Sequence, residues 1–138
     1  MAKKSKGRNS RIVTIDTKGR VMIPVQLRRG FRYGELLYLT AGSGPCILLL
    51  DKQQWNNLIN SYHELDPLIE SDERNKLRML QGYMEEIEID PQGRILLPGH
   101  LTGYAKISAK ALFLRLSGWI EIWNPDLFEK RVSQINNG

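Results

Sequence analysis

Two carboxylate–arginine motifs carry most of the chemistry that this sequence offers. The motif Asp-x-x-Gly-Arg lies within IDTKGRVMIP at 15–24 and returns within IDPQGRILLP at 89–98, an offset of 74 residues. The recurring acid, glycine and arginine are Asp16, Gly19 and Arg20 in the first copy and Asp90, Gly93 and Arg94 in the second. Each arginine either points back to the aspartate of its own motif, which fixes the local backbone, or presents its planar fork to a phosphate or a guanine edge. The sequence leaves both interpretations open.

A catalytic use of the paired aspartates, as in the aspartic proteases, is also conceivable. In those enzymes a small residue and a glycine follow the aspartate directly, whereas Thr17-Lys18 and Pro91-Gln92 stand here. A neighbouring arginine also keeps a carboxylate ionised, so the two acids are not expected to share a proton. The spacing therefore argues against a catalytic pair.

The remaining residues that could perform chemistry do not form recognisable sites. His63 and His100 have no His or Cys partner at metal-ligand spacing. AGSGP at 41–45 lacks the G-x-x-x-x-G-K-[ST] pattern of a phosphate-binding loop and is typical of a hairpin turn. We therefore predict no catalytic residues, no metal, no cofactor and no small-molecule substrate, and we expect that the protein is not an enzyme.

The elements that hold the two motifs are predicted to be β-strands joined by tight turns. β-branched and apolar runs flank each motif, RIVTI and RVMIP in the first copy and EIEI and RILLP in the second. An aspartate that starts a turn accepts backbone N–H bonds, and a glycine supplies the positive φ that a hairpin turn needs. Asp16, Gly19, Asp90 and Gly93 are therefore expected to be structural turn residues.

The likeness between the two copies continues beyond the motifs. LLYLTAGSGPCILLLD and ALFLRLSGWIEIWN both indicate a strand, a turn and a second strand that runs into a helix. Asp51 with Gln54 matches a capping box, and Asn124 with Pro125 is typical of another helix start. The chain is therefore one unit written twice.

These signals predict an α+β fold that is mainly β with helices. The expected divisions are a basic N-terminal tail at 1–11, a first repeat with its helix at 12–62, a helical linker at 63–85, and a second repeat with the C-terminal helix at 86–136. The linker helix is expected to begin at Asp66-Pro67. Because a unit of about 45 residues buries little apolar surface alone, we expect two pseudo-symmetric units that share one core.

The chain is strongly basic at one end and mildly acidic elsewhere. Its net charge is +5, but residues 1–32 hold ten Lys or Arg and one acid, while the rest hold ten and fourteen. This concentration of positive charge indicates a polyanionic partner, either nucleic acid or an anionic membrane surface. The opening MAKKSKGRNSR is either an arm that contacts such a partner or a disordered tail.

Composition also bears on the compartment. No apolar run approaches the ~20 residues that span a bilayer, and the basic start lacks the apolar core of a secretory signal. Cys46 is the single cysteine, so no intrachain disulfide can form and a reducing compartment is expected. We therefore expect a cytoplasmic protein without a membrane segment.

The doubled motif, the QGRILLP phrase and the IEIW strand before a helix resemble the MraZ family, within the wider AbrB/SpoVT group of swapped-hairpin proteins. The resemblance extends over residues 12–132 and implies two AbrB-like swapped-hairpin units that assemble into a homo-oligomeric ring. It also implies a nucleoid-associated bacterial transcriptional regulator. Such a regulator binds short direct repeats in double-stranded DNA, upstream of the division and cell-wall gene cluster that includes its own gene.

An alternative from another class is a ring-forming assembly protein. Its ring would be the function, and its basic end would bind RNA or anionic surfaces without sequence preference. Competition with unrelated duplex DNA distinguishes the two, because a regulator keeps its operator when random duplex is in excess.

The candidate DNA-binding residues are Arg11, Lys18, Arg20, Arg28, Arg29 and Arg94. Lys18 stands at the tip of the first turn. The second turn follows the acidic run MEEIEID, whose carboxylates repel a duplex. We therefore expect the first turn to be the main reader of DNA and Arg94 to serve the fold more than the affinity.

Overall fold

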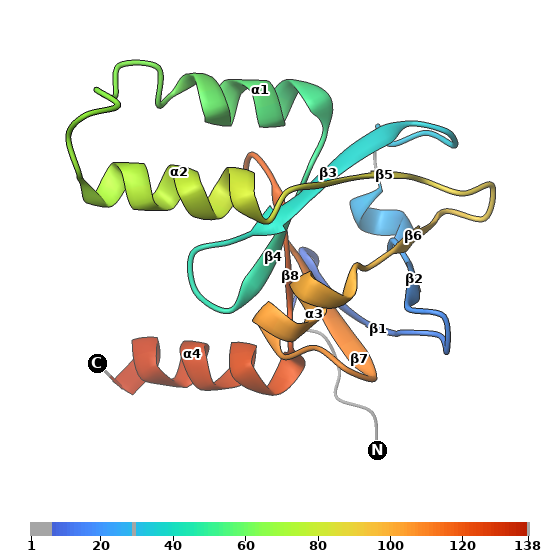
Figure 1. Cartoon of the computed structure of the whole chain (residues 1–138). Coiled ribbons are helices and arrows are strands. Elements are labelled where there is room, and N and C mark those ends of the chain that lie inside the picture. The colour runs from blue at the N-terminus through green and yellow to red at the C-terminus, as the bar shows by residue number, and fades with distance from the viewer. Residues whose placement is uncertain (1–6, 29, 138) are drawn as a thin grey trace.

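Each half of the chain contributes the same succession of elements to a computed structural model that describes residues 7–28 and 30–137 (Figure 1). The first half contains β1 (Ser10–Thr14), β2 (Arg20–Met22), the 3-10 helix η1 (Val25–Leu27), β3 (Leu36–Ala41), β4 (Cys46–Leu50) and α1 (Lys52–Asn60). The second contains β5 (Glu85–Glu88), β6 (Arg94–Leu96), α3 (Gly99–Ala105), β7 (Lys110–Arg115), β8 (Ile120–Trp123) and α4 (Pro125–Asn137). Helix α2 (Asp72–Gly82) joins the halves.

The strands of the two halves are interleaved in one sheet. Six of them form an antiparallel sheet in the order β1-β7-β8-β4-β3-β5, and β2 and β6 form a separate two-stranded ribbon. The first strand of each half pairs with the third strand of the other half, as β1 with β7 and β5 with β3. Exchanging the halves reverses the strand order and leaves it otherwise unchanged. The expected α+β fold with two pseudo-symmetric swapped-hairpin units is therefore confirmed.

The strands on either side of each turn do not pair with each other, so the simple hairpin that the sequence suggested is wrong. Asp16 N–H donates to the Arg20 carbonyl at 2.9 Å, which closes the turn. Beyond that bond the strands diverge, because β1 joins β7 and β2 joins β6. Val21 stands opposite Ile95 in this ribbon, and both are buried. Val21 and Ile95 thus bury their apolar side chains at a contact between the two halves.

One core fills the space between the two halves. Its largest fully buried side chains are Val21, Ile23, Leu37, Leu39, Ile47 and Leu49 from the first half and Ile95, Leu101, Phe113 and Ile122 from the second. They belong to a single cluster. Neither half therefore encloses this core by itself, which explains why the chain carries the unit twice.

The linker helix begins later than the sequence suggested. Asp66 does not start it: its Oδ1 accepts a hydrogen bond from Leu68 N–H at 2.9 Å within a turn. Helix α2 begins at Asp72, after Ser71, whose Oγ accepts from Arg74 N–H at 3.1 Å. Ser71 followed by two acids in the first turn is the stronger start signal, because the cap and the helix dipole act together.

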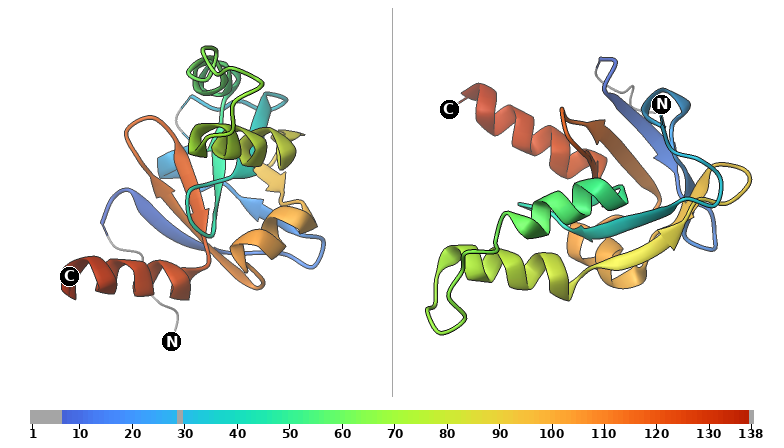
Figure 2. Two further views of the ribbon diagram at one scale, coloured as in Figure 1. Left: turned by 60° about the vertical axis from the view of Figure 1, so that its left-hand side comes forward. Right: turned by 90° about the horizontal axis from the view of Figure 1, so that it is seen from above.

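The other helix starts agree with the sequence. Asp51 and Gln54 form the predicted capping box of α1, and Asn124 Oδ1 accepts from Asp126 N–H at 2.8 Å at the start of α4. Helices α1 and α2 lie together on one side, while α4 lies apart from them (Figure 2). Within the described residues, no helix is long and apolar enough to cross a bilayer.

Candidate nucleic-acid interface

The first loop, residues 16–20, is organised by the carboxylate of Asp16. Its Oδ1 accepts hydrogen bonds from the backbone N–H groups of Lys18 and Arg20, both at 2.9 Å. Its Oδ2 accepts from Arg20 Nε at 3.0 Å. Gly19 has a φ of +84°, the left-handed conformation that favours glycine. One side chain therefore fixes both the backbone of the loop and the direction of its arginine.

The second loop, residues 90–94, has the same geometry. Asp90 Oδ1 accepts from the backbone N–H groups of Gln92 and Arg94 at 2.9 and 2.8 Å, and Oδ2 accepts from Arg94 Nε at 2.7 Å. Gly93 has the same φ of +84°. The side chains that make these bonds belong to the shared residues of the doubled motif, while the residues that differ take part only through a backbone N–H and expose their side chains.

Each arginine thus lies against the aspartate of its own loop. The atom engaged is Nε, and the Arg20 and Arg94 side chains are 33% and 28% exposed. A guanidinium held through Nε does not use both of its terminal nitrogens in that bond, so their fork can still bind a phosphate or a base edge. Pairing with aspartate and contact with DNA are therefore compatible functions of the same side chain.

The hydrogen bonds also keep both carboxylates ionised. The Arg20 backbone N–H is the main cause that lowers the pKa of Asp16, and it outweighs burial. Burial raises the pKa of Asp90, but the backbone and side-chain bonds from Arg94 together hold that pKa below its ordinary value. Both loops therefore retain their ion pairs at neutral pH.

The two loops lie at opposite ends of the β2–β6 ribbon and support each other. Arg20 stands opposite Leu96, whereas Arg94 stands opposite Met22. The Gly19 carbonyl accepts from Leu97 N–H at 2.9 Å, and the Gly93 carbonyl accepts from Ile23 N–H at 3.0 Å. The shape of each loop therefore depends on the strand contributed by the other half.

The surroundings of the loops differ in a way that the sequence did not reveal. Arg28 follows the first loop in the chain, but its guanidinium covers the second loop: a Cβ added to Gly93 would collide with Arg28 Nη1. Lys18 is exposed at the tip of the first loop. The exposed tip of the second loop carries Pro91 and Gln92, with no charge of their own.

The remaining candidates lie elsewhere. Arg11 lies near the start of β1, where its Nη1 donates to the carbonyls of Gly7 and Ser10 at 3.0 and 2.8 Å. Arg29 lies outside the described residues. The structure therefore brings Lys18 and Arg20 together on one loop and Arg28 and Arg94 together on the other, and it separates Arg11 from both.

Two further arginines join Arg11, and neither is among the DNA-binding candidates predicted from the sequence. A groove with a volume of about 410 Å³ is lined by Arg8, Asn9, Arg11, Gln26 and Arg115. Arg8 belongs to the basic N-terminal run, but Arg115 is far away in the sequence. Only the pairing of β1 with β7 brings them together, so no local pattern could have identified this group.

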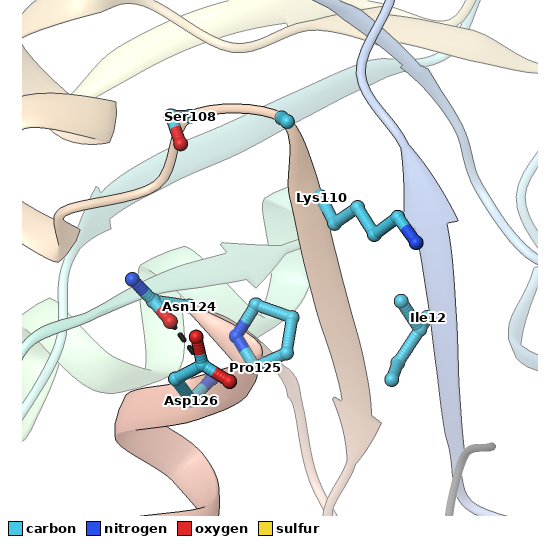
Figure 3. Close-up of a pocket in the computed structure, with 7 residues that line it drawn as sticks. Ile12, Ser108, Lys110, Asn124, Pro125 and Asp126 are labelled. Carbon is cyan, nitrogen blue, oxygen red and sulfur yellow. Dashed lines mark hydrogen bonds between the residues drawn. The ribbon is translucent and has the colours of Figure 1, made fainter. Parts of the chain in front are cut away.

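A second hollow lies between β1, the start of β7 and α4 (Figure 3). Its volume is about 340 Å³, and it is lined by Ile12, Ser108, Ala109, Lys110, Asn124, Pro125 and Asp126. Asn124 is occupied on both sides, because Oδ1 caps α4 and Nδ2 donates to the Lys106 carbonyl at 2.6 Å. The Asn124 side chain in this hollow therefore has a structural role. In residues 7–28 and 30–137, no group of three or more His, Cys, Asp or Glu is placed to hold a metal.

Comparison with known proteins gives a consistent result over nearly the whole chain. A family model described as "MraZ protein, putative antitoxin-like" matches residues 8–79 and again residues 80–138. A Transcriptional regulator MraZ of Caldanaerobacter subterraneus subsp. tengcongensis is 38% identical over 117 residues, covering 85% of this chain and 80% of the relative. One of Acetivibrio thermocellus is 34% identical over 123 residues, covering 89% and 84%.

These relatives bear the name of a transcriptional regulator, which is not an enzymatic role and which supports DNA as the partner. The family model matches once over each half, in accord with the two swapped units of the fold. The chain belongs to the MraZ family of transcriptional regulators.

Proposed function

We propose that this protein is a sequence-specific DNA-binding regulator that reads bases mainly through the loop at 16–20. The observation that carries the proposal is the Arg20 guanidinium, held by Asp16 through Nε beside the exposed Lys18. An arginine whose direction is already fixed loses less freedom on binding, and its terminal nitrogens match the O6 and N7 acceptors of guanine. Lys18 then contacts the adjacent phosphate as a point charge.

The target that we propose is a set of short direct repeats upstream of the division and cell-wall gene cluster, including the protein's own gene. Direct repeats suit a homo-oligomeric ring, because a ring presents identical loops at regular intervals. Repeats spaced near one helical turn of about 10 base pairs place successive loops on the same face of the duplex. We place the protein in the cytoplasm in association with the nucleoid, acting without catalysis.

The oligomer is proposed from the family resemblance. Val25, Leu68 and Ile135 are 69%, 91% and 70% exposed and come from three separate segments. Side chains scattered in this way do not by themselves define an interface. Sedimentation tests this part of the proposal: a ring gives a species of several subunits at micromolar concentration, and a stable monomer contradicts it.

A gel shift with competitor tests the DNA-binding function. The probe is a duplex from upstream of the protein's own gene, challenged with a large excess of random duplex of the same length. A regulator retains its probe, because specific affinity typically exceeds nonspecific affinity by ~10³-fold or more. Equal displacement by random duplex or by RNA instead favours the ring-forming assembly protein that binds polyanions without sequence preference.

A further inference from the structure

The cationic groove at the start of β1 is a second surface with the chemistry of a nucleic-acid site. Three of its five lining residues are arginines: Arg8, Arg11 and Arg115. We propose that this groove binds phosphodiester groups of the duplex backbone, next to the bases that the first loop reads. The proposal rests on the DNA-binding function proposed above and adds Arg8 and Arg115 to its contacts.

The register of the sheet places these side chains together. Arg115 N–H donates to the Asn9 carbonyl at 2.7 Å, and Arg11 stands opposite Phe113. Residues two apart on a strand share a face, so Arg11 and Arg115 are diagonal neighbours on the face that carries the buried Phe113. The core ends there, and Gln26 of η1 completes the wall from another element. The groove is therefore built by three segments that are distant in the sequence.

One arginine of the groove is held in place without a ligand. Arg11 is anchored by its bonds to the carbonyls of Gly7 and Ser10. Asp51 is an acid that lines an adjoining hollow together with Arg115. Its carboxylate caps α1 by accepting from Gln54 N–H at 2.8 Å, so it already has a structural role. A pre-ordered guanidinium binds an anion at a smaller cost in side-chain entropy than a mobile one.

The second half of the chain provides an internal comparison. The positions equivalent to Arg8, Asn9, Arg11, Gln26 and Arg115, shifted by 74 residues, are Gly82, Tyr83, Glu85, His100 and Ala41. There the Tyr83 ring stacks on His100 at 5.9 Å and meets Tyr104 at 5.3 Å, while His100 Nε2 lies 3.6 Å from Glu85 Oε1. Aromatic rings and a carboxylate thus occupy the place of the arginines. The fold does not require positive charge at this position, so the arginines of the first half point to a ligand.

The groove also lies at a useful distance from the first loop. Asp16 follows Arg11 of the groove by five residues along and just beyond β1, which span about 17 Å at ~3.3 Å per residue. This is of the same order as the ~12 Å width of the major groove of B-DNA. A duplex that receives the loop in its major groove therefore brings bordering phosphates near the arginines.

A matched pair of double variants tests the proposal. Arg8→Gln/Arg115→Gln removes two charges from the groove, and Lys52→Gln/Lys130→Gln removes two from exposed positions of α1 and α4. Fluorescence anisotropy measures binding of a random duplex and of the upstream duplex, from about 50 to 200 mM salt. We expect the groove variant to lose at least about tenfold in affinity for both duplexes, with the ratio between them unchanged. The slope of log K against log salt falls by about 1.8 for each bound subunit, since each lost phosphate contact contributes ~0.9.

Three results would overturn the assignment. One is a groove variant whose affinity and salt slope match those of the lysine control. Another is a groove variant that changes only the preference for the upstream duplex, which would make the groove a reader of bases. The third is saturable binding of inorganic phosphate in calorimetry, lost in the variant while duplex binding is kept, which would assign the groove to a small anion.

Two further variants separate an effect on folding from an effect on binding. The single variant Arg8→Gln changes an exposed side chain, and it should give about half of the loss in salt slope with an unchanged thermal melt. Arg115→Lys keeps the charge and should retain most of the nonspecific affinity. Failure of the regulator proposal looks different, because the wild type then shows no preference for the upstream duplex while the groove effect persists on random DNA.

Discussion

The carboxylates of Asp16 and Asp90 fix both the backbone of their turns and the position of an arginine side chain. Each accepts two backbone N–H bonds and one bond from an arginine Nε. The sequence predicted the turn because Asp and Gly act locally, within four residues of each other. It left open where the arginines point, and the structure shows that Arg20 and Arg94 each donate through Nε to the aspartate of their own loop.

Acid titration tests the role of these carboxylates in stability. Because the pKa of Asp16 and of Asp90 lies below the ordinary value of 3.8, the unfolded chain binds more protons in the window just below that value. The free energy of unfolding therefore rises with pH through this window, is fully present above it, and is lost as the pH falls through the folded values. We expect Asp16→Asn/Asp90→Asn to flatten this dependence in thermal melts from about pH 2 to 6. Glu86→Gln, an exposed acid of β5, is the control, and an unchanged pH dependence in the aspartate variant contradicts the account.

The contact between Arg28 and Gly93 makes a second test at this scale. Gly19→Ala and Gly93→Ala should each destabilise the fold by about 1–2 kcal/mol, because both glycines have φ of +84°. Gly93→Ala should cost more, since its Cβ collides with Arg28 Nη1. Adding Arg28→Ala should remove this excess and leave the backbone cost. Urea denaturation measures the difference, and a double variant as unstable as Gly93→Ala alone would show that Arg28 does not cover the loop.

At the scale of elements, the sequence predicted features that depend on local signals but did not predict which distant strands pair. The capping box at Asp51 was predicted because its partner is three residues away. The partner of β1 was not predicted. The strand that pairs with it, β7, lies about a hundred residues further along the chain, and the adjacent β2 is a competing candidate. The linker helix shows the same limit on a small scale, since Asp66 and Ser71 both resemble helix caps and only Ser71 acts as one.

The pairing of β2 with β6 predicts coupled effects on stability. Val21 and Ile95 are opposite each other and buried, so Ile95→Ala should destabilise by about 2–5 kcal/mol and Val21→Ala by less. The double variant should differ from the sum by at least about 0.5 kcal/mol, because both changes enlarge the same cavity. Val21→Ala combined with Leu80→Ala, in a separate apolar cluster, is the control. Full additivity of the first pair in urea denaturation would contradict contact between the halves.

At the scale of the whole molecule, near-symmetry of fold accompanies asymmetry of charge. The two halves share strand order and turn geometry. They differ in Lys18 against Gln92 at the loop tips and in Arg11 against Glu85 at the ends of the sheet. The repeat and the excess of bases in the first 32 residues were visible in the sequence. The groove was not visible in the sequence, because Arg115 comes next to Arg8 and Arg11 only through the pairing of β1 with β7. The first half is therefore the half that we expect to face DNA.

A comparison of matched arginines tests this central claim most directly. Arg20→Ala and Arg94→Ala remove the same side chain from the same place in two loops of like geometry. Gel shift on the upstream duplex, thermal melt and sedimentation are measured for both variants. We predict that Arg20→Ala weakens binding by about 1–3 kcal/mol with the oligomer intact. Arg94→Ala is predicted to lower the melting temperature more than the affinity. A folded, oligomeric Arg94→Ala that no longer binds DNA, beside an Arg20→Ala that binds normally, would show that the second loop is the reader.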